Sequence, residues 1–148
     1  MLIAAGVLIG VMIVSLGLAL YSDLDAYVES SHEVIRFNEQ NAFNAQFMKY
    51  INYIGAEKQF DLTIHDVITA SNLAYENNFN YDATEDERGN PSTLYVAVYL
   101  NGMSIENNTS DIARMLTENS EKSYKCANTD IKFSQVTGRV FEIYFKEE

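Results

Sequence analysis

Charge is missing from the first part of this sequence. No Asp, Glu, Lys or Arg occurs from Met1 to Tyr21, and no Lys or Arg occurs before Arg36. A secretory signal peptide has a basic n-region, a short apolar core and a small-residue cleavage site. Here the basic region is absent, the apolar run is too long, and Ala19-Leu20-Tyr21 is a poor cleavage signal. We therefore expect residues 1–21 to be retained.

Cysteine and basic residues are also scarce. Cys126 is the only cysteine, which excludes an intramolecular disulfide and leaves stability to a hydrophobic core or to assembly. The chain has 10 Lys and Arg against 21 Asp and Glu, so its formal net charge is −11. Nucleic acids and anionic lipid surfaces attract clustered Lys and Arg. We therefore expect no nucleic-acid partner.

Familiar catalytic motifs are absent as well. The sequence has no nucleophile elbow, no phosphate-binding glycine loop, no HExxH and no CxxC. His32 and His65 have no second ligand at a spacing typical of zinc sites, and Cys126 is interpreted as a structural thiol. The acidic stretch 82–87 lacks the spacing of an EF-hand loop, so a solvated loop is favoured over a calcium site. We predict no enzyme activity, no cofactor and no metal site.

The uncharged segment has the length of a membrane-spanning helix. A helix of this length spans roughly 31 Å, which matches the hydrocarbon core of a bilayer. Acidic residues follow the segment, and Lys and Arg are absent from this flank, so we expect the rest of the chain to lie outside the cytoplasm. Gly6 and Gly10 form a GxxxG pair, a spacing that lets helices approach closely.

Residues 22–54 are predicted to continue the same helix. This range contains no Pro and no Gly, and its apolar residues recur at spacings of three and four, typical of an amphipathic helix. Gly55 is a plausible stop. One helix to residue 54 would be about 80 Å long. Its apolar face comprises Leu24, Tyr27, Val28, Val34, Ile35, Phe43, Phe47, Tyr50, Ile51 and Ile54.

Residues 55–148 are predicted to form a globular part. A second helix begins after Thr63, a candidate N-cap with Asp66 three residues on, and ends near Asn77-Asn78. The stretch 94–100 alternates like a strand, and Asn101-Gly102 predicts a tight hairpin after it.

The C-terminal third adds a short helix and a second hairpin. The short helix begins near Ser110 or Asp111, and two strands flank Thr137-Gly138. The predicted fold class is therefore α+β, with a small antiparallel sheet and one or two extra helices packed on the amphipathic half of the long N-terminal helix.

This layout resembles that of type IV pilins and pilin-like subunits. The resemblance rests on the apolar helix half 1–21, the amphipathic half 22–54 and the globular part 55–148. It implies a prepilin peptidase that removes a basic leader directly before the apolar stretch and methylates the new N-terminus. That would explain a chain that opens inside an apolar helix. The segments "FNAQFMKYI" and "TIHDVITASNLAYENN" are also similar to membrane-anchored proteins of Gram-positive bacteria that carry pilin-like N-termini.

The chain departs from the family at one position. The family usually carries Glu at mature position five, where this sequence has Ala5, which points to a minor or tip-type subunit or to a divergent filament class. The resemblance implies a homopolymer, with other pilin-like subunits as further partners, a cell-surface location and the cytoplasmic or inner membrane as an assembly intermediate. The residues expected to pack in the filament are Met1, Ala5, Gly6, Val7, Gly10, Val11, Val14, Gly17 and Leu18. Those expected to join the helix to the globular part are Leu24, Tyr27, Val28, Phe43, Phe47 and Ile51.

The sequence is therefore compatible with two hypotheses about function. The first is a structural subunit of an extracellular type IV pilus-like filament. The alternative is a single-pass membrane-anchored extracellular binding domain that does not polymerise. An anchored enzyme would need a site that the sequence does not reveal.

Overall fold

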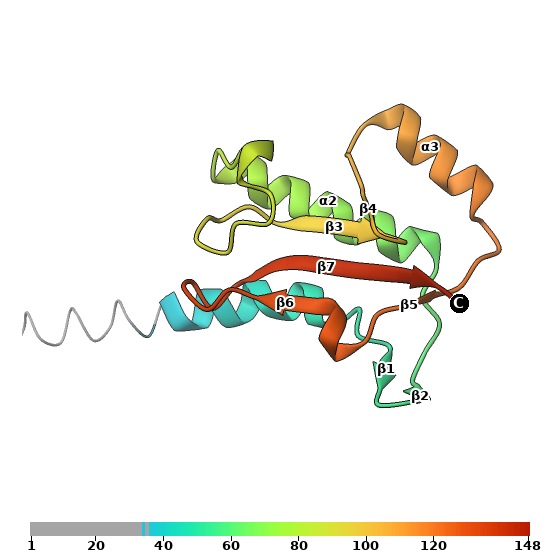
Figure 1. Cartoon of the computed structure of the whole chain (residues 1–148), viewed down its shortest axis with the longest axis horizontal. Coiled ribbons are helices and arrows are strands. Elements are labelled where there is room, and N and C mark those ends of the chain that lie inside the picture. The colour runs from blue at the N-terminus through green and yellow to red at the C-terminus, as the bar shows by residue number, and fades with distance from the viewer. Residues whose placement is uncertain (1–33, 35) are drawn as a thin grey trace, which may run out of the picture. The chain divides into compact units, whose positions relative to one another are not determined.

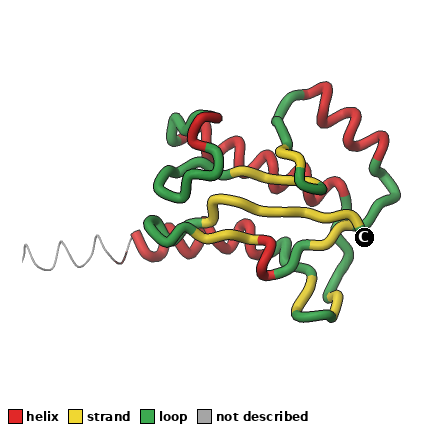
Figure 2. The backbone as a smooth tube through the Cα atoms, viewed as in Figure 1, coloured by secondary structure: helices red, strands yellow, loops and turns green. Residues whose placement is uncertain are grey.

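The computed structural model describes residue 34 and residues 36–148, and the predictions for residues 1–33 and 35 lie outside the described residues. The chain divides into two compact units, Met1–Glu39 and Gln40–Glu148, and we call the second unit the head. The head is α+β, as predicted: helices pack on a mixed sheet of five strands, beside a small two-stranded sheet (Figures 1 and 2). None of the helices in the described part of the chain has the length and apolar character that a membrane-spanning segment needs.

The first helix of the head ends earlier than expected. Residues 36–48 are helical, and the part of this helix that belongs to the head is called helix 40–48. Turn residues 49–50 follow it, whereas periodicity predicted a helix to residue 54. The chain turns because Asn52 pairs with a distant segment: its backbone N–H donates to the carbonyl of Cys126 at 2.9 Å. Strand β1 (Tyr53–Ile54) and strand β2 (Glu57–Lys58) then form a short antiparallel hairpin. Gly55, the expected helix stop, instead turns this hairpin with φ of +63°.

Helix α2 (Ile64–Asn80) matches the second predicted helix and extends slightly beyond its predicted end. The Asp66 carboxylate accepts a hydrogen bond from the Thr63 N–H at 2.8 Å, which satisfies a donor that the first helical turn leaves free. Its inner face is buried over most of its length. The buried residues are Ile64, Val67, Ile68, Ala70, Ser71, Ala74 and Asn77.

The first hairpin forms where Asn101-Gly102 predicted it. Strand β3 (Ala97–Leu100) pairs antiparallel with strand β4 (Met103–Ser104). Asn101 and Gly102 both have positive φ, 52° and 82°, which is the backbone of a type I′ turn. Helix α3 (Thr109–Glu118) follows, with Asn108 as its N-cap.

The sheet is mixed, which corrects the prediction of a purely antiparallel one. Strand β7 (Val140–Glu147) lies at its centre, antiparallel to β5 (Tyr124–Lys125) and β6 (Ile131–Phe133) but parallel to β3. The strand order is β4-β3-β7-β5, and β6 also pairs with β7. Parallel pairing is possible because the chain between β3 and β7 is a long crossover that includes α3. Short 3₁₀ turns, η1 (Glu85–Glu87) and η2 (Asn128–Asp130), complete the elements.

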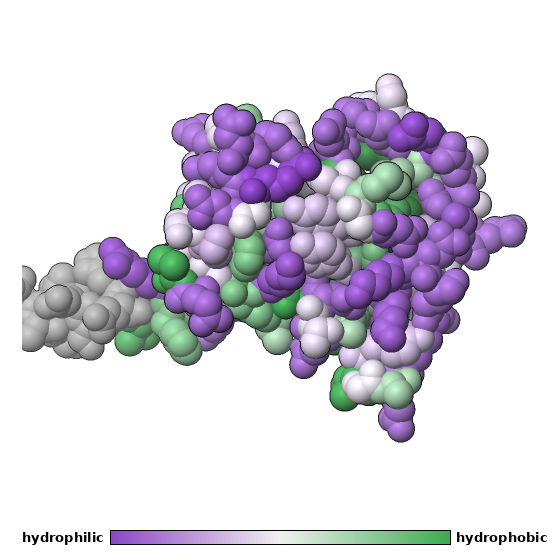
Figure 3. Space-filling view, in the orientation of Figure 1, coloured by the Kyte–Doolittle hydropathy of each residue, from purple (hydrophilic) through white to green (hydrophobic). Residues whose placement is uncertain are grey.

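The hydrophobic core lies between the sheet and two helices. Figure 1 shows α2 behind β3, and the first helix of the head behind β6 and β7. Val98 and Ile143 pair across β3 and β7, and both point into this core. The opposite face carries Tyr99 and Tyr144, whose rings stack with centroids 4.6 Å apart. The surface seen from this side is mostly hydrophilic (Figure 3).

Candidate functional site

The residues predicted to matter fall into two sets. Three of them, Phe43, Phe47 and Ile51, belong to the head, where Phe47 lies in the core and the other two pack against it. The remainder lie outside the described residues. These are Met1, Ala5, Gly6, Val7, Gly10, Val11, Val14, Gly17, Leu18, Leu24, Tyr27 and Val28.

Aromatic side chains hold helix 40–48 to the rest of the head. Phe47 is fully buried and meets the ring of Phe43 edge to face, with centroids 5.3 Å apart. Tyr50, in the turn that follows this helix, packs edge to face against Phe145 of β7, with ring centroids 5.9 Å apart. Aromatic contacts of this geometry add to the stabilisation from buried area alone. The apolar stripe of this helix therefore forms part of the core rather than a peripheral contact.

Asn44 fastens the same helix to the start of β7. Its side-chain oxygen accepts from the Val140 N–H at 2.9 Å, and its side-chain nitrogen donates to the Gly138 carbonyl at 3.0 Å. Asn44 is 8% exposed, so water competes little for these bonds. The side-chain amide of Asn44 thus bonds one backbone N–H and one backbone carbonyl, as a residue of a neighbouring strand would. Gly138 has φ of +67°, and a Cβ there would clash with the Gln40 side chain.

Arg139 reinforces this junction from the outside. Its guanidinium lies over the Phe43 ring, 3.9 Å from the centroid, and donates to Asn77 Oδ1 of α2 at 2.7 Å. The ring of Tyr81 lies 5.0 Å away. Arginine suits this position because its planar group can stack on an aromatic ring and donate hydrogen bonds together. Helix 40–48, α2 and the β6–β7 turn therefore meet at one residue.

Asn52 makes a second amide junction, at the far end of β7. Its side-chain oxygen accepts from the Cys126 N–H at 2.8 Å, and its nitrogen donates to the Tyr124 carbonyl at 2.9 Å. Asn52 is fully buried. Sequence reasoning missed both Asn44 and Asn52. For Asn44 a signal exists: it lies three residues before Phe47 and seven before Ile51, a polar residue on the apolar stripe.

The remaining candidates for chemistry within the described residues, Cys126 and His65, belong to different parts of the fold. Cys126 is fully buried, and burial raises the pKa of its thiol to about 12, so the nucleophilic thiolate is strongly disfavoured. His65 is exposed on α2, and His32 lies outside the described residues. Among residues 34 and 36–148, no group of three or more His, Cys, Asp or Glu side chains is placed to hold a metal ion.

The acidic stretch 82–87 is ordered by its own contacts. It contains the 3₁₀ turn η1, and Glu87 accepts from the Thr84 N–H at 3.0 Å. Glu85 pairs with Arg88 and accepts from the Tyr95 hydroxyl at 2.5 Å. Two of its four carboxylates, those of Glu85 and Glu87, therefore have partners within the head, whereas Asp82 and Asp86 are exposed.

The outward tyrosines form a small polar network on the sheet. The Tyr144 hydroxyl donates to Glu142 at 2.8 Å, and Lys132 lies 3.0 Å from the same carboxylate. Burial raises the pKa of Tyr99 and of Tyr144, with the nearby Glu142 adding to both shifts. These groups satisfy one another, so the network serves as a stabilising ladder across β3, β7 and β6.

Neither protein-family profiles, nor curated protein sequences, nor solved structures match the chain.

Proposed function

We propose that the chain is a structural subunit of an extracellular type IV pilus-like filament, assembled through its apolar N-terminal residues. The observation that supports this most is the way the head is built around its first helix. Phe47 and Asn44 tie helix 40–48 to the core and to β7. In a filament, tension passed along the chain into helix 40–48 would therefore act on the core of the head, and not on a flexible loop.

The apolar residues 1–21 supply the cohesion in this proposal. Fully burying a Leu, Ile, Val or Met side chain is worth about 1.5–3 kcal/mol, and the segment carries some dozen of them. Removal from the bilayer offsets much of this gain, since lipid tails are equally apolar. Close packing at small residues such as Gly6 and Gly10 then contributes the remainder.

A charge inside the apolar segment tests the proposal. We expect Val7→Asp to abolish filaments in the fraction sheared from cells, because a carboxylate cannot be buried unpaired between helices. Val7→Leu is the matched control and should assemble. Far-UV circular dichroism of both variants should show the same folded head. Normal filaments from Val7→Asp would refute filament assembly through this segment.

The mass of the native protein adds an independent readout. A sheared protein whose mass fits a chain from Met1 with one N-methyl group would support prepilin processing. Absence of the wild-type chain from the sheared fraction would instead favour the second candidate, a single-pass membrane-anchored binding domain that does not polymerise. One observation favours that candidate: a pocket of about 360 Å³ in the head, beside β3.

A further inference from the structure

The pocket beside β3 lies where the sheet stops. Strand β4 pairs only with Tyr99 and Leu100, and the last bond along this edge joins the Ile105 N–H to the Val98 carbonyl at 2.9 Å. Just before the start of β3, the side-chain amide of Asn78 takes the place of a neighbouring strand. It donates to the Val96 carbonyl at 2.9 Å and accepts from the Val96 N–H at 2.8 Å. Between these two contacts the edge of β3 is open toward the pocket.

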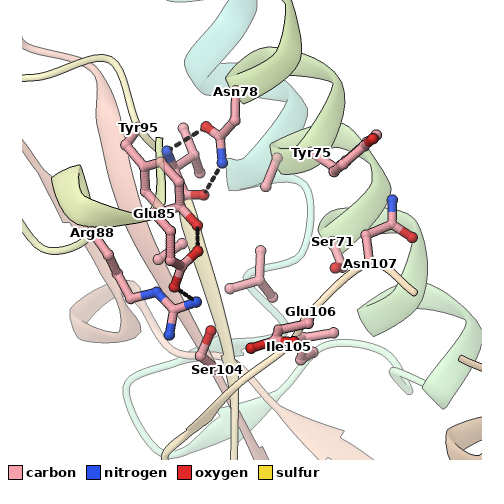
Figure 4. A pocket seen from close by; sticks show the side chains of 14 residues that line it. Ser71, Tyr75, Asn78, Glu85, Arg88, Tyr95, Ser104, Ile105, Glu106 and Asn107 are labelled. Carbon is pink, nitrogen blue, oxygen red and sulfur yellow. Dashed lines mark hydrogen bonds and ion pairs between the residues drawn. The ribbon is translucent and has the colours of Figure 1, made fainter. Parts of the chain in front are cut away.

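Three parts of the chain wall this pocket. Figure 4 shows Glu85, Arg88 and Tyr95 on one side, and Ser71 and Tyr75 of α2 on the other. The segment 104–107 lines a further side, while Val96 and the first two residues of β3, Ala97 and Val98, continue the segment that holds Glu85, Arg88 and Tyr95. At about 360 Å³, the pocket falls at the lower end of the range for small-molecule sites. It therefore suits one ring-sized group and not a long ligand.

The lining mixes hydrogen-bond donors with acceptors. Ser71 and Asn107 offer a hydroxyl and an amide, and Glu106 offers a carboxylate. Arg88 pairs with Glu85 through Nη2, while its buried Nε has no hydrogen-bond partner within the described residues. An arginine has five N–H donors, so most of the donor capacity of Arg88 remains free. A ligand that both donates and accepts matches this lining.

The charges of the pocket exclude other ligand classes. An anion would face Glu85 and Glu106, and the charge of Arg88 is already balanced by Glu85. A cation would depend on Glu106, because Glu85 already binds both Tyr95 and Arg88. Glu106 is exposed, and an exposed ion pair contributes little. A neutral ligand with several hydroxyls avoids both problems.

We infer that this pocket binds one neutral sugar residue of a glycan. The hydroxyls of the sugar would pair with Arg88, Ser71, Asn107 and Glu106, and its apolar C–H face would rest on an aromatic ring. Tyr75 is the ring best placed for this, since it borders the pocket and is 54% exposed. The inference does not depend on whether the chain polymerises.

The test is a titration of the full ¹⁵N-labelled chain with single sugars, followed by NMR in a detergent that carries no sugar headgroup. The probes are glucose, galactose, mannose and N-acetylglucosamine. At least one should shift the amide signals of Ser71, Val98 and Asn107 with a Kd of about 1 mM, insensitive to salt. No shift from any of the four at about 50 mM, well above such a Kd, would overturn the inference.

A pair of variants on α2 locates the binding. Tyr75→Ala should weaken binding about tenfold through the lost ring contact. Phe79→Ala is the matched control, because Phe79 lies one turn further along, is 72% exposed and does not line the pocket. Alanine favours helix at both positions, so both variants should fold. Equal sugar affinity in Tyr75→Ala and the wild-type chain would refute the site.

A second pair tests the polar side and the competing ligand class. Glu106→Gln should weaken sugar binding severalfold, whereas Glu121→Gln, an exposed change outside the pocket, should not. Lysine methyl ester serves as a cationic probe. If it binds in place of the sugars, and salt weakens its binding, the pocket recognises cations and the sugar assignment fails. The Val7→Asp chain should bind sugar as the wild type does, which separates this inference from filament assembly.

Discussion

Helix 40–48 and helix α3 are both amphipathic, yet the head holds them in different ways. Helix 40–48 places Phe47 in the core and makes side-chain hydrogen bonds to residues more than ninety positions away in the sequence. Helix α3 has no buried residue. Its side-chain hydrogen bonds join residues no more than four positions apart, as from Thr117 to Ala113 and from Asn119 to Met115. Only partly buried Ile112, Met115 and Leu116 connect it to the core.

The space beside α3 agrees with this difference. A pocket of about 700 Å³ lies between α3 and the β3–β4 turn, lined by Met115 and Arg114 on one side and by Leu100 and Met103 on the other. Hydrophobic contact without long-range hydrogen bonds attaches a helix but does not fix it tightly. We therefore expect local opening to require less free energy at α3 than at helix 40–48. Helix 40–48 is thus a firmly attached part of the head, and α3 is a weakly attached one.

The largest effect should come from Phe47→Ala. Removing a fully buried phenylalanine leaves a cavity and costs about 3–5 kcal/mol, a large share of the stability of an ordinary domain. Urea unfolding of the full chain, followed by circular dichroism, measures the change. Met48→Ala, at the next and 45% exposed position, is the control and should unfold almost as the wild type does. A loss below about 1 kcal/mol in Phe47→Ala would show that this helix is not part of the core.

Asn44→Ala should have the next largest effect. The Val140 N–H and the Gly138 carbonyl would lose their side-chain partner, and leaving such groups buried and unpaired costs about 2–3 kcal/mol. The same urea experiment tests it, with Asn41→Ala as the control because Asn41 is exposed on the same helix. If the two variants unfold alike, the hydrogen bonds of Asn44 contribute nothing and the contrast with α3 rests on packing alone.

Local signals in the sequence predicted the elements whose causes are local. The Thr63 and Asp66 pair predicted the start of α2, and Asn101-Gly102 predicted the first hairpin. The spacing of Phe43 and Phe47 likewise identified the stripe that the head packs against its core.

Features that depend on distant partners were not predictable in this way. The first helix ends at residue 48 because Asn52 pairs with a segment more than seventy residues later. Periodicity contains no information about that partner. The parallel pairing of β3 with β7 has the same origin, since it depends on how the whole crossover returns. The pocket beside β3 combines residues from three segments, none of which forms a motif alone.

Leu116→Ala probes the weakly held region. Because Leu116 is only partly buried, its truncation should cost about 1–2 kcal/mol, less than truncation of a core residue. Native-state hydrogen exchange gives the sharper test. The amides of α3 should exchange through local opening, at a lower free energy than those of residues 44–48. Equal exchange free energies in the two helices would contradict the weaker attachment of α3, because α3 would then unfold only together with the rest of the head.

Glu148→Gln should have the smallest effect, and one that depends on pH. Hydrogen bonds from Lys58 and Tyr53 hold the pKa of Glu148 below its usual value. A carboxyl whose pKa is lower in the folded state stabilises the fold above its unfolded pKa of about 4.3, and that contribution is lost as the pH falls through the folded pKa. The urea midpoint of Glu148→Gln should therefore lie slightly below that of the wild type at neutral pH and converge with it in acid. Because the group is exposed, high salt should shrink the difference at neutral pH. If the two urea midpoints still differ in acid, Glu148 acts through packing and not through its charge. The contacts of Tyr53 and Lys58 with Glu148 would then not attach the β1–β2 hairpin to the end of β7 by electrostatic attraction.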